Sequence, residues 1–232
     1  VIDDYDRKPA FSSFLPGLAG VKGIPLWTFY TNRGQGMNSF GIDNKGNAIM
    51  EFNSANTAFE NTQVKGFRTF LKIDGEYYEP FFTYEKEAKR QMRMNKNSFK
   101  IIETNEKYGI EVTVNYYVLP NESIGALVRQ VSVKNIGDSA KEVQVIDGLP
   151  KIITYGIANG EFKEMSNLFK SWADIRNLEN KVPYYTLRAS TKDSAEVSDV
   201  EGGYYYLTVR DGKLQDVIYD VDTVFGYDLS LM

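Results

Sequence analysis

The 232-residue sequence contains no cysteine and no histidine. Without cysteine the chain can form no disulfide and has no thiolate nucleophile or thiolate metal ligand, which fits a reducing compartment, so we expect a cytoplasmic protein. Without histidine it lacks the side chain whose pKa lies near neutrality. Serine and cysteine triads, histidine metal sites and histidine acid–base catalysis are therefore excluded. Acid–base chemistry would have to come from carboxylates, lysine or tyrosine.

A large excess of one charge and long apolar runs are also missing. The chain has 27 basic and 31 acidic side chains and a net charge of −4, so nucleic acid is not an expected partner. No stretch approaches the ~20 apolar residues that cross a bilayer, so no membrane partner is expected. The sequence starts at Val1 and stops in an apolar-rich segment at Met232. We expect both ends to be cut edges, although a processed N-terminus would explain Val1 equally well.

Aromatic residues are abundant, with 16 Tyr and 14 Phe, and this composition favours strands. Between Ile110 and Val118 every second residue is apolar or aromatic, which predicts a strand with one buried face. The run at 99–103 precedes it and predicts a hairpin. Further strands are expected at 127–133, with 143–147 as its antiparallel partner, and at 184–189, 204–210 and 215–219, with a tight turn at 211–212.

Short strands separated by glycines are expected from Trp27 to Ile73. Many short strands with regular turns predict one large antiparallel β-sandwich domain over residues 1–232 with one or a few short helices. The one convincing helix has apolar residues at helical spacing and begins at Asn159 or Gly160. Its apolar residues are Phe162, Met165, Leu168, Phe169, Trp172 and Ile175.

The densest polar cluster spans residues 30–38 and follows a tryptophan. Asparagine, glutamine and arginine can make paired hydrogen bonds to vicinal hydroxyls, and aromatic rings can stack on a pyranose, so the composition suits a sugar. The alternative is a glycine-rich turn whose side-chain amides cap loop backbone. The predicted sugar-facing residues are Trp27, Tyr30, Asn32, Arg33, Gln35 and Asn38.

Other polar and aromatic groups are interpreted mainly as structural. The acidic pairs Glu76/Glu79, Glu85/Glu87 and Asp220/Asp222 could supply two carboxylates for glycoside chemistry, but close pairs of this kind are usually solvated surface. The basic segment 85–100 is expected to be a solvated loop or an edge strand. The aromatic residues at 77–82 and 204–206 could form a sugar platform or a domain interface, with burial as the default for half of them.

Several segments resemble the N-terminal part of bacterial 1,2-β-oligoglucan phosphorylases and related cellobiose-phosphorylase-like proteins. The most specific block is residues 23–36, GIPLWTFYTNRGQG, followed by SFGIDNK at 39–45 and IMEF at 49–52. The resemblance continues with GFRTFLK at 66–72, LPNE at 119–122 and VRQVSVKN at 128–135, which are more generic for the fold.

The resemblance implies a β-sandwich similar in shape to galactose mutarotase, joined through a helical linker to a catalytic α/α barrel of the same polypeptide. In such enzymes inorganic phosphate is the co-substrate and attacks the anomeric carbon of a β-gluco-oligosaccharide with inversion, and a barrel Asp is the general acid. The 232 residues lack the helices of that barrel, so no catalytic residue can be assigned and no resident cofactor or metal is expected. A calcium site of carboxylates and carbonyls remains chemically open.

The resemblance therefore implies a non-catalytic sandwich domain of a glycoside phosphorylase that packs on the barrel and borders the sugar site or a homodimer interface. Two alternatives stay open: an independent carbohydrate-binding module, and a purely structural or dimerising domain. A free-standing mutarotase-like epimerase would be expected to use a histidine pair, and the sequence has no histidine.

Overall fold

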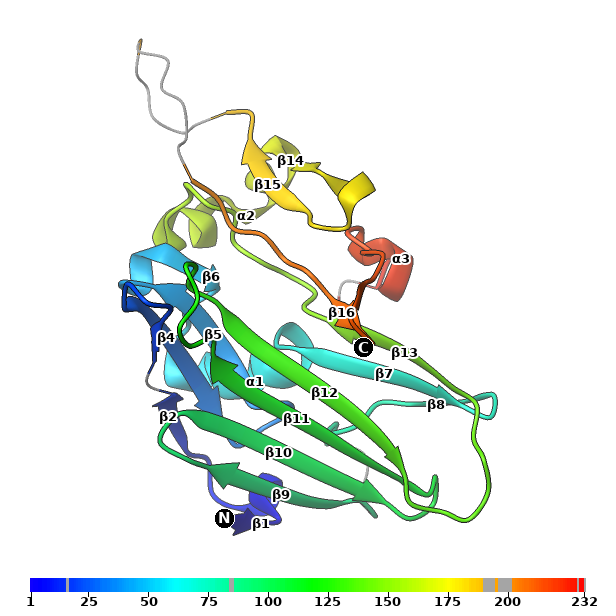
Figure 1. Cartoon of the computed structure of the whole chain (residues 1–232). Coiled ribbons are helices and arrows are strands. Elements are labelled where there is room, and N and C mark those ends of the chain that lie inside the picture. Colours follow the sequence, from blue (N-terminus) through cyan, green and yellow to red (C-terminus); the bar gives the residue numbers. More distant parts are fainter. Residues whose placement is uncertain (16, 84–85, 190–194, 196–201, 229, 232) are drawn as a thin grey trace.

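The structure is a computed structural model that describes residues 1–15, 17–83, 86–189, 195, 202–228 and 230–231. It is an antiparallel β-sandwich, as the alternating apolar pattern predicts (Figure 1). One layer is a five-stranded sheet whose neighbouring strands are, in order, β1 (Ile2–Asp3), β9 (Lys89–Met94), β10 (Ser98–Asn105), β11 (Ile110–Val118) and β12 (Leu127–Asn135).

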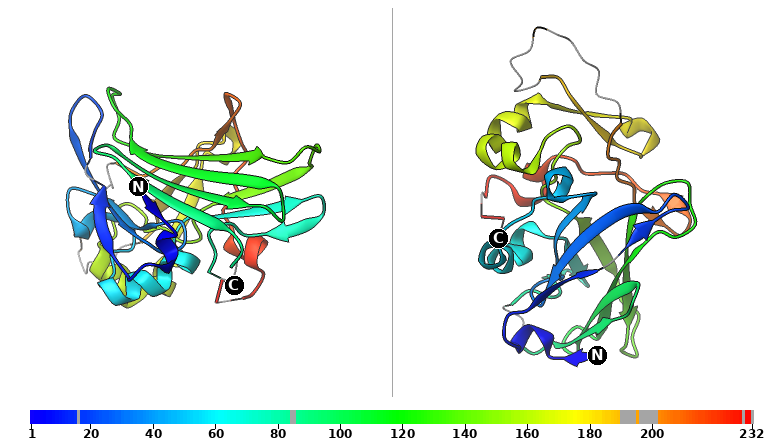
Figure 2. Two further views of the ribbon diagram at one scale, coloured as in Figure 1. Left: turned by 90° about the horizontal axis from the view of Figure 1, so that it is seen from below. Right: turned by 90° about the vertical axis from the view of Figure 1, so that its left-hand side faces the viewer.

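Two further sheets lie across the core from this layer. The first contains β2 (Ser12–Leu15), β4 (Ile24–Thr31), β5 (Met37–Ile42) and β6 (Ala48–Met50), with β3 (Leu18–Ala19) also paired to β4. The second has the order β13 (Val143–Gly148), β7 (Arg68–Ile73) and β8 (Glu76–Tyr78). Figure 2 shows the green strands on one side of the molecule and the helices on the other.

The main core lies between these layers, and it confirms the predicted face of β11. Ile110, Val112, Val114 and Tyr116 are all almost fully buried. They belong to one apolar cluster with residues of the opposite sheets, including Tyr30, Met37, Met50, Leu71 and Ile73. The hairpin of β10 and β11 is also confirmed, since Ile101 pairs with Val114 across it.

The predicted helix is α2 (Asn159–Trp172), which begins at Asn159 and is followed by strand β14 (Ala173–Arg176). Phe162 and Phe169 on α2 are buried in a second cluster with Ala48, Ile153 and Ile157. Ile175 lies in β14 and therefore does not continue the helix. No helix among the described residues is long and apolar enough to cross a bilayer.

The helices are few and short, as predicted. The expectation that short strands fill residues 27–73 was wrong, because α1 (Ala55–Lys65) lies within that region. Its sequence is mostly polar, and only Ala58 and Thr62, one turn apart, are buried. Such a narrow contact leaves no apolar stripe to recognise. The short helix α3 (Val221–Phe225) and the 3-10 turns η1 (Tyr5–Arg7), η2 (Lys45–Asn47) and η3 (Leu178–Asn180) complete the helical content of the described chain.

The predicted hairpin between residues 127–133 and 143–147 does not form. Strand β12 pairs with β11, while β13 crosses to the other layer and pairs with β7, so that Val143 lies opposite Ile73. The Asp74 side chain accepts a 2.9 Å hydrogen bond from the Glu142 N–H, and the Asp74 N–H donates a 2.9 Å bond to the Glu142 carbonyl. These contacts at the start of β13 align the strand with β7.

The last third of the chain has less sheet than predicted. Strand β15 (Tyr184–Leu187) pairs with β14, which confirms the strand expected there. The expected strand at 204–210 is reduced to β16 (Val209–Arg210), and the expected strand at 215–219 does not form. Instead β17 (Lys213–Leu214) pairs with β16 across the predicted turn. Asp211 and Gly212 both have positive φ in that turn, as a tight hairpin of this length requires.

Gly36 lies where the two facing sheets pack closely against each other. Its φ is 82°, and a Cβ added there would lie 2.6 Å from the Phe99 ring in the opposite sheet. Gly75 has a similar φ of 94° but nothing within 4 Å of its Cβ position. We expect Gly36→Ala to lower the free energy of unfolding by about 3 kcal/mol and Gly75→Ala by about 1 kcal/mol, because only the first adds a clash to the backbone strain. Urea denaturation measures both, and equal losses would contradict the close packing at Gly36.

Candidate functional site

The six predicted sugar-facing residues lie on β4, on β5 and in the turn between them. Four are buried, with exposed fractions of 7% for Tyr30, 0% for Asn32, 3% for Gln35 and 7% for Asn38. Trp27 and Arg33 are partly exposed. The turn therefore points most of its polar side chains into the protein.

Asn32 holds the N-terminal segment against the turn. Its Nδ2 donates hydrogen bonds to the carbonyls of Tyr5, Lys8 and Pro9 at 2.9, 3.3 and 3.1 Å. Its Oδ1 accepts a 2.9 Å bond from the Phe11 N–H. These bonds match the alternative interpretation of the polar cluster, in which side-chain amides cap loop backbone.

Gln35 belongs to a buried polar network that also contains Thr69 and Arg129. Its Nε2 lies 3.0 Å from Thr69 Oγ1, its Oε1 accepts from Arg129 Nη2, and its carbonyl accepts a 3.1 Å bond from the Tyr116 hydroxyl. Arg129 also donates to Asp147 Oδ2. Burial lowers the pKa of Arg129, but Tyr116 and Asp147 outweigh it, so the net pKa is raised and the guanidinium stays charged.

Three more of the six residues are also engaged with protein groups. Trp27 Nε1 donates a 2.9 Å bond to the Asn44 carbonyl, and Arg33 Nη1 donates a 2.9 Å bond to the Asn32 carbonyl. The Tyr30 ring stacks on Phe99 with 4.5 Å between ring centres. Five of the six residues thus divide among separate structural contacts, and sugar binding by any of the six stays a prediction.

Asn38 is the exception, because it lines a cleft and its Nδ2 is buried without a hydrogen-bond partner among the described residues. The space in the cleft that a water-sized sphere can occupy is about 20 Å³, and it lies between β5, β6, α1, the segment 151–153 and α2. Its polar lining is Asn38, Glu51, Asn53, Asn61, Thr62, Lys65 and Lys151.

The local folds of α1 and of the segment after β13 place the charged groups of the cleft. Asn61 and Lys65 are four residues apart on α1 and therefore share one face of the helix. The Ile153 N–H donates a 2.7 Å bond to the Ile49 carbonyl, which sets residues 151–153 beside β6 and its continuation at Glu51. Lys151 Nζ lies 4.6 Å from the centre of the Phe162 ring.

Electrostatics at the cleft are dominated by two lysines and one glutamate. Burial lowers the pKa of Lys151, Glu51 opposes this by raising it, and Lys65 lowers it further. Neither lysine forms an ion pair within the described part of the chain. The arrangement supplies several hydrogen-bond donors around a small space and can bind a ligand that accepts them.

The residues Glu51, Lys65 and Lys151 were missed as site candidates. In the sequence Glu51 belongs to one of the blocks that resemble the phosphorylases, and the position of Lys65 depends on α1, which the residue pattern does not predict. Lys151 lies in a segment without regular structure between β13 and α2, where the spacing of residues does not predict which side chains lie together.

In two of the acidic pairs considered from the sequence, one member has a structural partner. Glu79 forms a 2.7 Å ion pair with Arg68, and burial raises the pKa of Glu79 while Arg68 opposes the shift. Asp220 caps α3 and accepts a 3.1 Å bond from the Asp222 N–H. Glu85 lies outside the described residues, so its pairing with Glu87 is open.

The expectation that the whole basic segment is solvated was wrong at Arg90. Lys89, Arg93 and Lys96 are exposed, but Arg90 is only 4% exposed and forms ion pairs with Glu103 at 2.6 Å and Asp6 at 2.7 Å. The aromatic run at 77–82 divides as alternation suggests: Tyr77 is 80% exposed, whereas Tyr78 and Phe81 are buried. Tyr205 and Tyr206 are exposed and Tyr204 partly so.

No family model and no curated protein matches the sequence.

The bonds of Asn32 predict the effect of an isosteric change. Asn32→Asp removes a donor that serves three carbonyls and places a carboxylate against them, so we expect the free energy of unfolding to fall by about 3 kcal/mol or more. Asn97→Asp, at an exposed position between β9 and β10, is the matched control and should change it by about 0.5 kcal/mol or less. Chemical denaturation of both variants provides the comparison. If Asn32→Asp left the free energy of unfolding unchanged, the Asn32 amide would not be needed for folding and would be free for a ligand.

Proposed function

We propose that this chain is the non-catalytic sandwich domain of a cytoplasmic glycoside phosphorylase that acts on β-linked gluco-oligosaccharides. In this proposal the sandwich packs on a catalytic α/α barrel of the same polypeptide and borders the sugar site or a homodimer interface. One support is the resemblance of residues 23–52 to such enzymes. The other is a structural observation: many large apolar residues in the last third of the chain are exposed.

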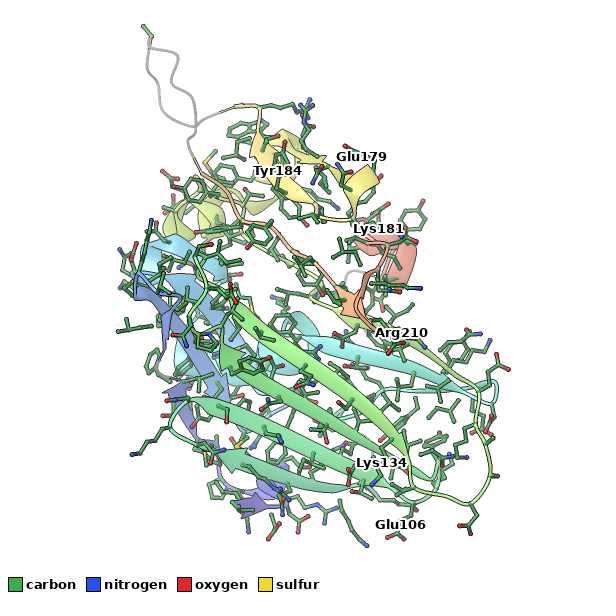
Figure 3. The ribbon with its side chains drawn as sticks, viewed as in Figure 1. Glu106, Lys134, Glu179, Lys181, Tyr184 and Arg210 are labelled. Atoms are coloured by element: carbon green, nitrogen blue, oxygen red, sulfur yellow. The ribbon has the colours of Figure 1, made fainter. Side chains whose placement is uncertain are left out.

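Nine of the twenty exposed large apolar or aromatic residues in the described chain lie between residues 184 and 227. Their exposed fractions run from 37% for Tyr206 to 93% for Tyr227. They are Tyr184, Tyr205, Tyr206, Leu207, Val209, Leu214, Ile218, Tyr219 and Tyr227, which we call the C-terminal apolar residues. Figure 3 shows Tyr184 on β15 and Arg210 on β16. Large exposed apolar surfaces typically mark an interface.

The sheet edges near these residues support the same interpretation. β12 is the last strand of its sheet and β13 the last strand of its own, so each has one edge without a described partner strand. Val145 and Ile146 on β13 are 47% and 45% exposed. Long edges are usually covered in the working protein. A packed second domain would cover both these edges and the C-terminal apolar residues.

In this proposal the barrel catalyses the phosphorolysis of the glycosidic bond. Phosphate oxygen forms the new bond to the anomeric carbon, the glycosidic bond breaks, and the general acid protonates the glycosidic oxygen, which leaves as a sugar hydroxyl. The products are a sugar 1-phosphate and a shortened oligosaccharide. The sandwich contributes by excluding water and shaping the acceptor side, for which it needs a rigid turn at 32–36, and the bonds of Asn32 and Gln35 supply that rigidity.

An independent carbohydrate-binding module is the second candidate, favoured by the exposed pair Tyr184 and Tyr205. These residues form an isolated antiparallel bridge and are 42% and 46% exposed. Neighbouring tyrosines on one surface can stack on sugar rings. Binding of a β-gluco-oligosaccharide by the 232-residue chain alone, lost in Tyr184→Ala, would favour this candidate.

The test compares the native polypeptide, captured with an antibody against this chain, with the 232-residue chain itself. We expect a mass several-fold above 26.4 kDa and phosphate-dependent release of a sugar 1-phosphate from β-gluco-oligosaccharides. Hydrogen exchange at 203–219 should be slower in the native polypeptide, because the second domain covers those residues. Exchange around Val21, which is 66% exposed at the β3–β4 turn, is the internal control and should not change.

A native polypeptide of about the same mass as the chain would contradict the proposal. So would a larger one that lacks phosphorolytic activity or leaves exchange at 203–219 unchanged.

A further inference from the structure

The cleft beside α1 has the chemistry of a binding site whose ligand is unassigned. Its walls are apolar where they meet the core, at Met50, Ile153 and Phe162. All three side chains are buried, with exposed fractions of 2%, 1% and 5%. Its rim carries Lys65, Lys151 and Glu51. Charged groups therefore surround a space with a fixed, buried floor.

Asn38 gives an independent indication that something accepts hydrogen bonds here. The residue is 7% exposed, lines the cleft, and its Nδ2 has no partner among the described groups. A buried donor without an acceptor is unfavourable by about 1–3 kcal/mol, and native proteins usually satisfy such groups. An acceptor atom in the cleft would remove this penalty.

The two lysines favour an acceptor that carries negative charge. Neither forms an ion pair with a described acidic group, and Lys65 lowers the pKa of Lys151, which means that the two ammonium groups repel each other. With Glu51 included, the three charges sum to one positive charge. One negative charge therefore balances the cleft.

We propose that this cleft binds a small singly charged carboxylate, held by Lys65 and Lys151 at the rim and by the Asn38 amide at the floor. A carboxylate has two oxygens and about four acceptor positions, enough for two ammonium groups and one amide N–H. The proposal concerns a site separate from the barrel contact and does not depend on the proposed function.

The test uses two ligands that differ only at one carbon. D-glucuronate and D-glucose share the pyranose ring, and only the first carries a carboxylate; acetate supplies the carboxylate without the ring. Each is titrated into the ¹⁵N-labelled 232-residue chain at constant ionic strength, with sodium chloride as the salt control. We expect acetate and glucuronate to shift the side-chain amide signal of Asn38 and the backbone signals of residues 65 and 151, and glucose and chloride to leave them in place.

Variants identify the groups that bind. Lys151→Gln and Lys65→Gln should each weaken carboxylate binding about tenfold or more, because each removes a charge-assisted hydrogen bond. Lys170→Gln, on the exposed side of α2 and outside the cleft lining, is the matched control and should bind as the unmodified chain does. Both cleft lysines are exposed at the rim, so their substitution leaves the core intact.

Three results would overturn the proposal. The first is the absence of any acetate or glucuronate shift at these signals. The second is binding of glucose as strong as that of glucuronate, which would show that ring hydroxyls are recognised. The third is carboxylate binding unchanged in Lys65→Gln and Lys151→Gln.

Discussion

The buried guanidinium of Arg129 is the interaction on which the arrangement of the sandwich depends. β12 and β13 do not pair with each other, so no backbone ladder joins the five-stranded layer to β7 and β13. Arg129 extends from β12, donates a 3.1 Å bond to Tyr116 on β11, and contacts Asp147 on β13 and Thr69 on β7. A buried arginine is tolerated only when its donors are satisfied, and here each of its donor nitrogens has a partner.

The same network explains why the turn at 32–36 is rigid. Gln35 joins it through both its side chain and its carbonyl, while Asn32 fixes the other half of the turn to the N-terminal segment. Arg90 is a second buried arginine, on β9 of the five-stranded sheet, and it forms an ion pair with Glu103. Burial raises the pKa of Glu103, and the Arg90 guanidinium opposes that shift. With the interior held in this way, the surfaces available for function are the cleft beside α1 and the C-terminal apolar residues.

The sequence was informative where one physical pattern dominates. Alternation identified the buried face of β11, and helical spacing located α2. It could not identify α1, whose contact with the core consists of Ala58 and Thr62, nor the partner of β13, which depends on contacts at Asp74 across the fold. Residue type alone marked Asn32 and Gln35 as polar and suited to sugars, but their burial follows from how the turn folds inward. Of the six predicted site residues, only Asn38 lines the cleft.

A double-mutant cycle between Arg129 and Asp147 tests most directly whether this network joins the layers. Arg129→Met, Asp147→Leu and the double variant are compared with the unmodified chain by urea denaturation. The account predicts a coupling free energy of about 2 kcal/mol or more, since each single variant leaves the remaining charge partly buried and without its main partner. Additive effects within about 0.5 kcal/mol would show that the two residues act independently and would contradict it.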